Sequence, residues 1–336
     1  MLVSTCELLQ CLACGSGRLD AIGASGDSIE QGSLSCAQCG KDYYVKEGIP
    51  IFLDDQLSTS SEEVHFATLN QDSQQKVKQR EWHDRACMEQ DFEYVKFPYR
   101  SSALYASLIY YELREVEDLL SNAPYQRIAN LCCGHGFELE FLSQLGHSIL
   151  ATDISWNSLR KTRLKGRELG MNVEALCCDA ENLPLKDNSF DLVLTHHSFH
   201  HLPVPIRGLE EMARVSRYRL ALFEPAKGIM RTVVTKLGVK PETEESGNFV
   251  YEFGREEIEN FCVRHNLILR RFYKYLISPP AREPAWFRRM DAWRITPILS
   301  GLISRANRQF GNLIGTKCGV VLEKEGNCGG ASSPSN

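Results

Sequence analysis

The sequence lacks any excess of basic charge. Its 336 residues include 38 lysines and arginines against 43 aspartates and glutamates, a net charge of −5. Because proteins that bind nucleic acid neutralise phosphates with clustered lysine and arginine, this balance disfavours a nucleic-acid substrate. The hydrophobic fraction of 43% is ordinary for a folded globular protein.

Long apolar runs are missing as well. No stretch approaches the roughly 20 residues that a helix needs to span a bilayer. The first residues, 1–7, lack the basic region and the apolar stretch of a secretory signal peptide. We therefore expect a cytoplasmic protein.

The placement of the 13 cysteines in the sequence does not indicate a disulfide framework. Cys132, Cys133, Cys177 and Cys178 fall at the ends of predicted buried strands, where cysteine behaves as a small hydrophobic residue. Such thiols suit a reducing compartment.

Four other cysteines have the spacing of a metal site. Cys11 and Cys14 form one Cys-x2-Cys pair, and Cys36 and Cys39 form a second. Two such pairs supply the four thiolates of a tetrahedral zinc site. With no open coordination position, the zinc ion is expected to be structural. Cys6 lies outside this spacing.

A turn between two predicted strands points to a nucleoside ligand. Gly134 and Gly136 follow an apolar strand over 127–132 and let the backbone approach a ligand closely. Asp153 ends the next strand, where a carboxylate can accept both ribose hydroxyls, and Asp179 ends a third. The third glycine of the dinucleotide-binding pattern is absent. S-adenosylmethionine, which has a ribose and a base but no pyrophosphate, fits better.

Residues 125–225 resemble the class I S-adenosylmethionine-dependent methyltransferases, most closely the branch with quinone-biosynthesis and other small-molecule enzymes. The resemblance implies an α/β fold, a Rossmann-like seven-stranded sheet with helices on both faces and an antiparallel last strand. It also implies a set of cofactor-binding residues: Asn130, Cys132, Gly134, Gly136, Asp153, Ile154, Asp179, Ala180 and Thr195.

Two positions depart from the family pattern. Asn130 replaces the usual acid, which removes a charge attraction to the sulfonium. Cys132 replaces the first glycine, a change that a small side chain tolerates if its φ is negative. These departures keep open the hypothesis of a catalytically inactive cofactor-binding scaffold or partner module.

The N-terminal region, residues 6–54, resembles the zinc-ribbon activator subunit of tRNA and translation-factor methyltransferases. In that family the ribbon binds and stabilises a separate catalytic subunit, and here it is fused to one. Residues 1–57 include three basic and eight acidic residues, so we expect this region to pack against the rest of the protein and not to bind RNA.

Four histidines follow the predicted fourth strand. His196 and His197 leave its carboxyl end, where ligands bind in open α/β sheets. A histidine there can act as general base, and we assign this role to His197 first and His196 second. A metal site at these histidines is disfavoured because the side chains of adjacent residues rarely coordinate the same ion. His200 and His201 match a structural turn of the family. The Asn/Asp-Pro-Pro-Tyr/Phe motif of nucleic-acid amine methylation is absent.

The sequence divides into a zinc ribbon (1–57), a linker and lid segment (58–100), a methyltransferase domain (101–325) and a disordered tail (326–336). Residues 62–81 look like an exposed helix or a tether, and Trp82, His83 and Tyr99 are candidate lid residues.

An insertion at about 276–315 carries aromatic and apolar residues together with six arginines. It is interpreted as a cap for an acidic or amphiphilic acceptor, as an interfacial helix that contacts a membrane, or as a helical hairpin with solvated arginines.

The leading function is methyl transfer from S-adenosylmethionine to a small-molecule or lipid-like acceptor, on oxygen, nitrogen or carbon. The alternatives are an RNA or protein methyltransferase and the inactive scaffold. The sequence does not identify the acceptor or the oligomeric state.

Overall fold

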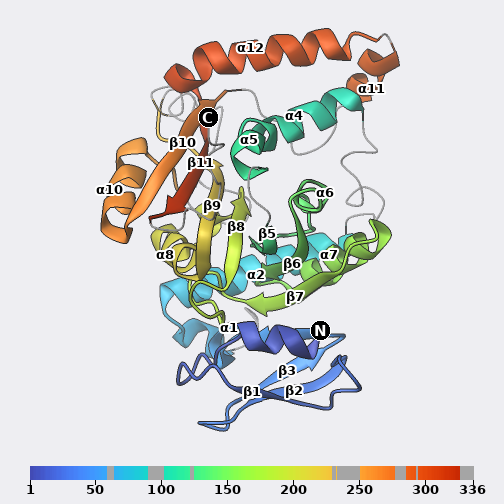
Figure 1. Ribbon diagram of the computed structural model, residues 1–336, viewed down its shortest axis with the longest axis vertical. Coiled ribbons are helices and arrows are strands. Elements are labelled where there is room, and N and C mark those ends of the chain that lie inside the picture. The colour runs from blue at the N-terminus through green and yellow to red at the C-terminus, as the bar shows by residue number, and fades with distance from the viewer. Residues whose placement is uncertain are drawn as a thin grey trace, which may run out of the picture.

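The computed structural model describes residues 1–58, 64–89, 102–121, 125–228, 232, 250–276, 285–292 and 294–325. Its strands are β1 (Leu19–Ile22), β2 (Gln31–Cys36), β3 (Asp42–Lys46), β4 (Ile49–Phe52), β5 (Tyr125–Leu131), β6 (Gly146–Asp153), β7 (Val173–Cys178), β8 (Phe190–His196), β9 (Ser216–Pro225), β10 (Leu267–Tyr275) and β11 (Lys317–Lys324). They form one sheet in the order β1-β2-β3-β4-β7-β6-β5-β8-β9-β11-β10 (Figure 1).

The seven strands from β7 to β10 form the predicted Rossmann-like sheet. Strands β7, β6, β5, β8 and β9 pair in parallel, and β11 lies antiparallel between β9 and β10. The expected seven-stranded sheet with an antiparallel last strand is therefore confirmed. Its inner strands are almost continuously apolar because both of their faces are covered.

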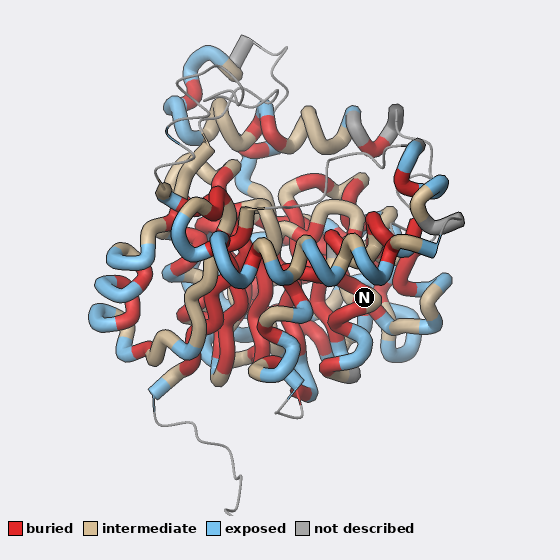
Figure 2. The backbone as a smooth tube through the Cα atoms, turned by 90° about the horizontal axis from the view of Figure 1, so that it is seen from above, coloured by how far each residue is buried: buried red, intermediate tan, exposed pale blue. Residues whose placement is uncertain are grey.

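Helices cover both faces of this sheet (Figure 2). The helices of the described residues are α1 (Asp55–Ser58), α2 (Gln71–Glu89), α4 (Ala103–Arg114), α5 (Glu117–Leu120), α6 (Leu139–Leu142), α7 (Trp156–Glu168), α8 (Pro205–Val215), α10 (Arg255–His265), α11 (Ala285–Ala292) and α12 (Thr296–Ile314). The described residues also form three 3₁₀ helices: η1 (Val3–Leu8), η2 (Val64–Thr68) and η4 (Phe199–His201).

Alternate residues of β5 enter two different cores. Ala129 and Leu131 belong to the core on one face of the sheet, and Ile128 belongs to the core on the other. All three are fully buried. Because successive side chains of a strand point to opposite faces, this alternation fixes the register of the strand and the direction of the residues that follow it.

The N-terminal ribbon is continuous with the large sheet. Strand β4 pairs in parallel with β7, where Ile51 and Phe52 lie opposite Cys177 and Cys178. The backbone N–H of Gln10 also donates to the Pro184 carbonyl at 2.9 Å. The ribbon thus covers the edge of β7 that would otherwise present unpaired backbone groups, which goes further than the packing module expected from sequence.

One segment differs from the sequence expectation, and several others are not tested. Residues 62–81 were predicted as an exposed helix or a tether, yet α2 packs against α7 and buries Val77 and Gln79. Tyr99 and the tail 326–336 lie outside the described residues, as do 277–284 and Trp293 of the insertion. The described part of the insertion forms α11 and α12, which pack against α4.

Candidate functional site

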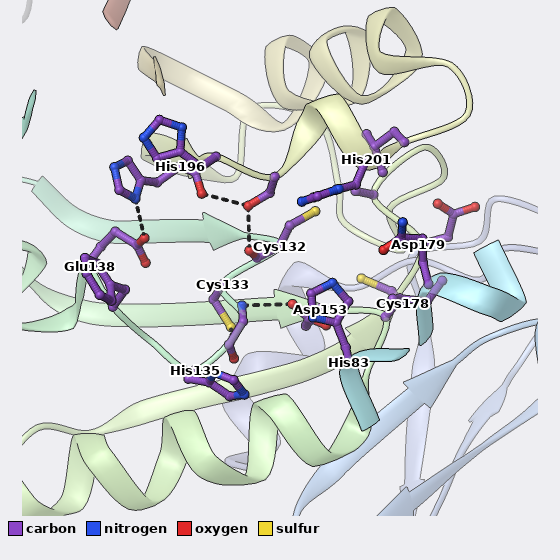
Figure 3. A pocket seen from close by; sticks show the side chains of 18 of the residues that line it. His83, Cys132, Cys133, His135, Glu138, Asp153, Cys178, Asp179, His196 and His201 are labelled. Atoms are coloured by element: carbon purple, nitrogen blue, oxygen red, sulfur yellow. Dashed lines mark hydrogen bonds and ion pairs between the residues drawn. The ribbon is translucent and has the colours of Figure 1, made fainter. Parts of the chain in front are cut away.

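A cavity of about 400 Å³ opens at the carboxyl ends of β5, β6, β7 and β8. Figure 3 shows side chains from all four strand ends converging on it. Among the residues that line it are eight that the sequence analysis assigned to the site: Cys132, Gly134, Asp153, Ile154, Asp179, Ala180, His196 and His197.

The turn after β5 uses left-handed backbone at three positions. Cys132 has φ 51°, Gly134 φ 50° and Gly136 φ 69°. The condition under which a side chain is tolerated at position 132, a negative φ, is thus not met, and Cys132 adopts a conformation that non-glycine residues rarely take. A Cβ atom at Gly136 would lie 2.9 Å from side-chain atoms of Leu139 and Thr162, so only glycine fits there.

Asp153 is held rigidly at the end of β6. Its Oδ2 accepts a hydrogen bond from the Gly134 backbone N–H at 2.9 Å, and its Oδ1 accepts one from the Ser155 N–H at 2.8 Å. Burial raises the pKa of this carboxyl group, while the two amides favour its charged form. Each oxygen keeps a further lone pair, so the carboxylate can accept both hydroxyls of a ribose.

Helix α2 closes the same end of the cavity through Lys76. The Lys76 ammonium lies 2.6 Å from the Asp179 carboxylate and 2.8 Å from the Glu181 carboxylate. Asp179 also accepts the Glu181 backbone N–H at 2.9 Å. Asp179, which the sequence analysis assigned to the cofactor site, is therefore ion-paired with Lys76 of α2, a contact that the sequence did not predict.

The other end of the cavity holds a buried group of one carboxylate and two histidines. Nε2 of His196 lies 2.9 Å, and Nε2 of His197 lies 2.6 Å, from the same Oε2 of Glu112 on α4. Neighbouring side chains of a strand normally point apart. They converge here because His197 has φ 51°, which turns the chain as it leaves β8.

A second carboxylate fixes the charge of His196. Nδ1 of His196 lies 2.9 Å from Oε1 of Glu138. Burial alone would favour the neutral ring, but the hydrogen bonds to Glu112 and Glu138 outweigh it and raise the pKa of His196 to about 9. At neutral pH His196 is therefore an imidazolium between two carboxylates.

His197 has the opposite protonation state. Burial lowers its pKa to about 4, and Glu112 only partly opposes this shift. The ring is neutral at neutral pH, and its Nε2 is engaged by Glu112. Nδ1 of His197 has no hydrogen-bond partner among the described residues. This nitrogen is available to accept a proton.

The three ligand atoms of Glu112, His196 and His197 lie within 4.8 Å of one another, a spacing that a metal ion could bridge. However, the Lys317 ammonium lies 3.3 Å from Nε2 of His197, where its charge repels a cation. The positive charges of Lys317 and His196 already balance Glu112 and Glu138. The group therefore favours proton chemistry over metal binding.

The turn that follows is built on Glu224 of β9. Its carboxylate accepts the backbone N–H groups of Ser198 at 2.9 Å and Phe199 at 2.7 Å, and it contacts Nδ1 of His200. Burial opposes the charged form, but His200 lowers the pKa of Glu224 to about 2. His200 is thus a structural residue, in agreement with the family turn expected from sequence.

Three residues assigned to the cofactor do not line the cavity: Asn130, Gly136 and Thr195. Thr195 is fully buried inside β8. Asn130 is also fully buried, and its amide Nδ2 donates to Oε2 of Glu138 at 3.1 Å. The acid missing at position 130 therefore has a counterpart, because Asn130 holds the Glu138 carboxylate at the cavity wall.

Sequence reasoning missed Glu112, Glu138 and Lys317, all of which line the cavity. Glu112 lies within an apolar helix, and its near-complete burial is the unusual feature. A carboxylate in a sequence that otherwise reads as a buried helix face is the one signal that could have identified it.

The four ribbon cysteines form a separate cluster. Their sulfur atoms lie within 4.8 Å of one another, with 3.6 Å between Cys11 and Cys39 and 3.6 Å between Cys14 and Cys36. Zinc–sulfur bonds of about 2.3 Å in a tetrahedron place sulfur atoms about 3.8 Å apart. The donor set and its spacing therefore fit a zinc ion with no open position.

Residues 129–219 match the methyltransferase domain family, so the prediction of a class I methyltransferase domain is confirmed. Demethylmenaquinone methyltransferase of Renibacterium salmoninarum is 30% identical over 128 residues, which cover 37% of this chain and 52% of that protein. Phthiotriol/phenolphthiotriol dimycocerosates methyltransferase of Mycobacterium tuberculosis is 33% identical over 92 residues, covering 27% and 34%.

The matched region thus spans about half or less of these relatives' own length. Among solved structures, magnesium protoporphyrin IX methyltransferase of Synechocystis is similar with a TM-score of 0.47 and 14% identity, covering 74% of this chain and 99% of that one.

Proposed function

We propose that this chain, through the methyltransferase domain that it contains, transfers a methyl group from S-adenosylmethionine to a small or lipid-like acceptor. The observation that supports this most directly is the composition of one cavity. A rigid carboxylate suited to a ribose lies at one end, and a neutral histidine oriented by a buried glutamate lies at the other. Relatives whose names give quinone and lipid acceptors agree with this class of substrate.

The residues of the cavity fit the proposed cofactor. Asp153 would accept the ribose hydroxyls, and the Glu138 carboxylate at the cavity wall would accept a hydrogen bond from the ammonium group of the cofactor. At Gly134 a Cβ atom would meet nothing within 4 Å, so the glycine leaves open space at the cavity wall. This open space speaks against the inactive scaffold, because side chains that block the pocket at 130–136 would be the sign of a site that no longer binds the cofactor.

The cofactor supplies an electrophilic methyl group, and the protein's part is to orient an acceptor for in-line attack and to take up its proton. We assign the proton to Nδ1 of His197. Glu112 holds the ring through Nε2 and compensates the positive charge that the ring then gains. An acceptor hydroxyl or phenol, which must lose a proton, suits this pair best, although methylation of nitrogen or carbon would use the same cofactor site.

The division into ribbon, lid segment and methyltransferase domain remains part of this proposal, as does a cytoplasmic location. No helix within the described ranges is long and apolar enough to cross a membrane.

Calorimetric titration of the zinc-replete protein with S-adenosylhomocysteine tests the cofactor site. Asp153→Ala should weaken binding about 100-fold, because two hydrogen bonds to a charged group contribute roughly 3 kcal/mol. Asp187→Ala is the matched control, since the Asp187 side chain is 67% exposed and pairs with Arg214 outside the cavity. Absence of binding by the unaltered protein would contradict the cofactor site and favour an inactive partner module instead.

A further inference from the structure

Helices α11 and α12 carry an apolar surface that methyl transfer does not require. Nine large apolar side chains are exposed among the described residues, and five of them lie on these two helices. The exposed apolar side chains are therefore concentrated on α11 and α12. We call the following residues, together with the nearby Arg305, the cap surface: Trp286, Ile298, Leu302, Phe310 and Leu313. Their exposed fractions run from 51% to 72%.

The opposite side of α12 explains how the helix is held. A Cβ atom at Gly311 would lie 2.2 Å from the Lys274 carbonyl oxygen, so the helix backbone touches β10 there. Oδ1 of Asn307 accepts the Leu276 backbone N–H at 3.0 Å, and Asn307 is fully buried. Leu299 and Ile303 pack with α4. Only one side of α12 therefore packs against the rest of the protein.

The apolar residues of the outer side therefore need another explanation. Ile298, Leu302 and Leu313 are spaced by about whole helical turns, so they share one stripe. Scattered exposed leucines need no cause, but a stripe within a surface that gathers five of the nine exposed large apolar side chains of the described residues marks an interaction site.

The charge of these two helices indicates what kind of partner the cap surface binds. Residues 285–292 and 294–314 contain five arginines and a single acid, Asp291, although the whole chain carries a net charge of −5. Arg308 is paired with Glu115 at 3.1 Å. An apolar stripe beside a cationic segment, on an otherwise acidic protein, complements a surface that is both apolar and negatively charged. We propose that the cap surface docks on an anionic lipid bilayer.

The cap surface is connected to the cavity through α4. Tyr105 lines the cavity, and its ring contacts that of Phe287 on α11 at a centroid distance of 6.1 Å in an edge-to-face geometry. Glu112 lies on the same helix. If the acceptor is lipid-like, which rests on the proposed function, docking places the source of acceptor next to the helix that carries the buried carboxylate.

Sedimentation with vesicles tests the docking. The zinc-replete full chain should pellet with phosphatidylglycerol-containing vesicles and much less with pure phosphatidylcholine. The triple variant Ile298→Ser, Leu302→Ser, Leu313→Ser should lower partitioning roughly ten-fold or more, because three apolar side chains no longer enter the bilayer. Arg305→Gln should weaken binding to the anionic vesicles alone.

Val263→Ser is the matched control, since Val263 on α10 is 79% exposed but lies outside the cap surface. Retained S-adenosylhomocysteine binding shows that a variant is folded, and this readout separates failure of docking from failure of the proposed function. The proposal is overturned if the unaltered protein does not pellet with anionic vesicles. It is equally overturned if the triple variant partitions to the same extent as the unaltered protein. It is also overturned if the triple variant only changes the oligomeric state, which would assign the stripe to a second copy of the chain.

Discussion

His197→Ala is expected to lower kcat by about 100-fold to 10,000-fold, the usual contribution of a positioned general base. Binding of S-adenosylhomocysteine should change little, since the ribose carboxylate lies at the other end of the cavity. The measurement is steady-state methyl transfer to the phenolic or lipid-like compound that screening yields. His265→Ala on α10 is the matched control, because it removes a histidine that lies away from the cavity. A variant at position 197 with unchanged kcat would contradict the assignment.

The pH profile of the unaltered enzyme gives an independent check. Nδ1 of His197 accepts a proton only when the ring is neutral, so activity should rise as the pH increases through its pKa of about 4. His196 loses its proton near its pKa of about 9, which leaves Glu112 and Glu138 less well compensated, and activity should fall there. Glu112→Gln removes a charge that raises the pKa of His196, so the basic limb should move to lower pH.

Much of the sheet could be predicted from sequence for a physical reason. The inner parallel strands are buried on both faces and therefore appear as short apolar runs that end in a polar residue. Asp153, which ends β6, follows from this pattern. A strand end also fixes where a side chain lies, because the carboxyl ends of parallel strands share one edge.

The acceptor end of the cavity could not be predicted in the same way. Glu112 and His196 are 84 residues apart, and their contact depends on how α4 packs over the sheet. The convergence of His196 and His197 requires the left-handed backbone at His197, which no local pattern demands. The pairing of β4 with β7 likewise joins residues more than 120 positions apart, so the sequence predicted a packing module but not a shared sheet.

That pairing gives the second large expected effect. Cys36→Ser, or removal of the metal by a chelator, should unfold the ribbon, since structural zinc contributes roughly 10 kcal/mol or more to the folding of small zinc modules. The loss of stability should extend to the methyltransferase domain. Leu9 and Phe52 share one buried core with Leu185 of the methyltransferase domain, and a freed β7 would expose its edge. We expect the Tm to fall by roughly 10 °C or more.

Because β7 ends at Cys178, directly before Asp179, ribbon loss should also weaken S-adenosylhomocysteine binding. Calorimetric unfolding, metal analysis and the same ligand titration together measure the effect. Cys262→Ser is the matched control, since this buried thiol lies on α10, away from the ribbon, and its replacement should leave one zinc ion bound. If Cys36→Ser keeps a full zinc content and an unchanged Tm, the four cysteines do not hold a structural ion. If it loses zinc but binds the ligand normally, the ribbon folds independently of the cofactor site, and the pairing of β4 with β7 does not support the strand that precedes Asp179.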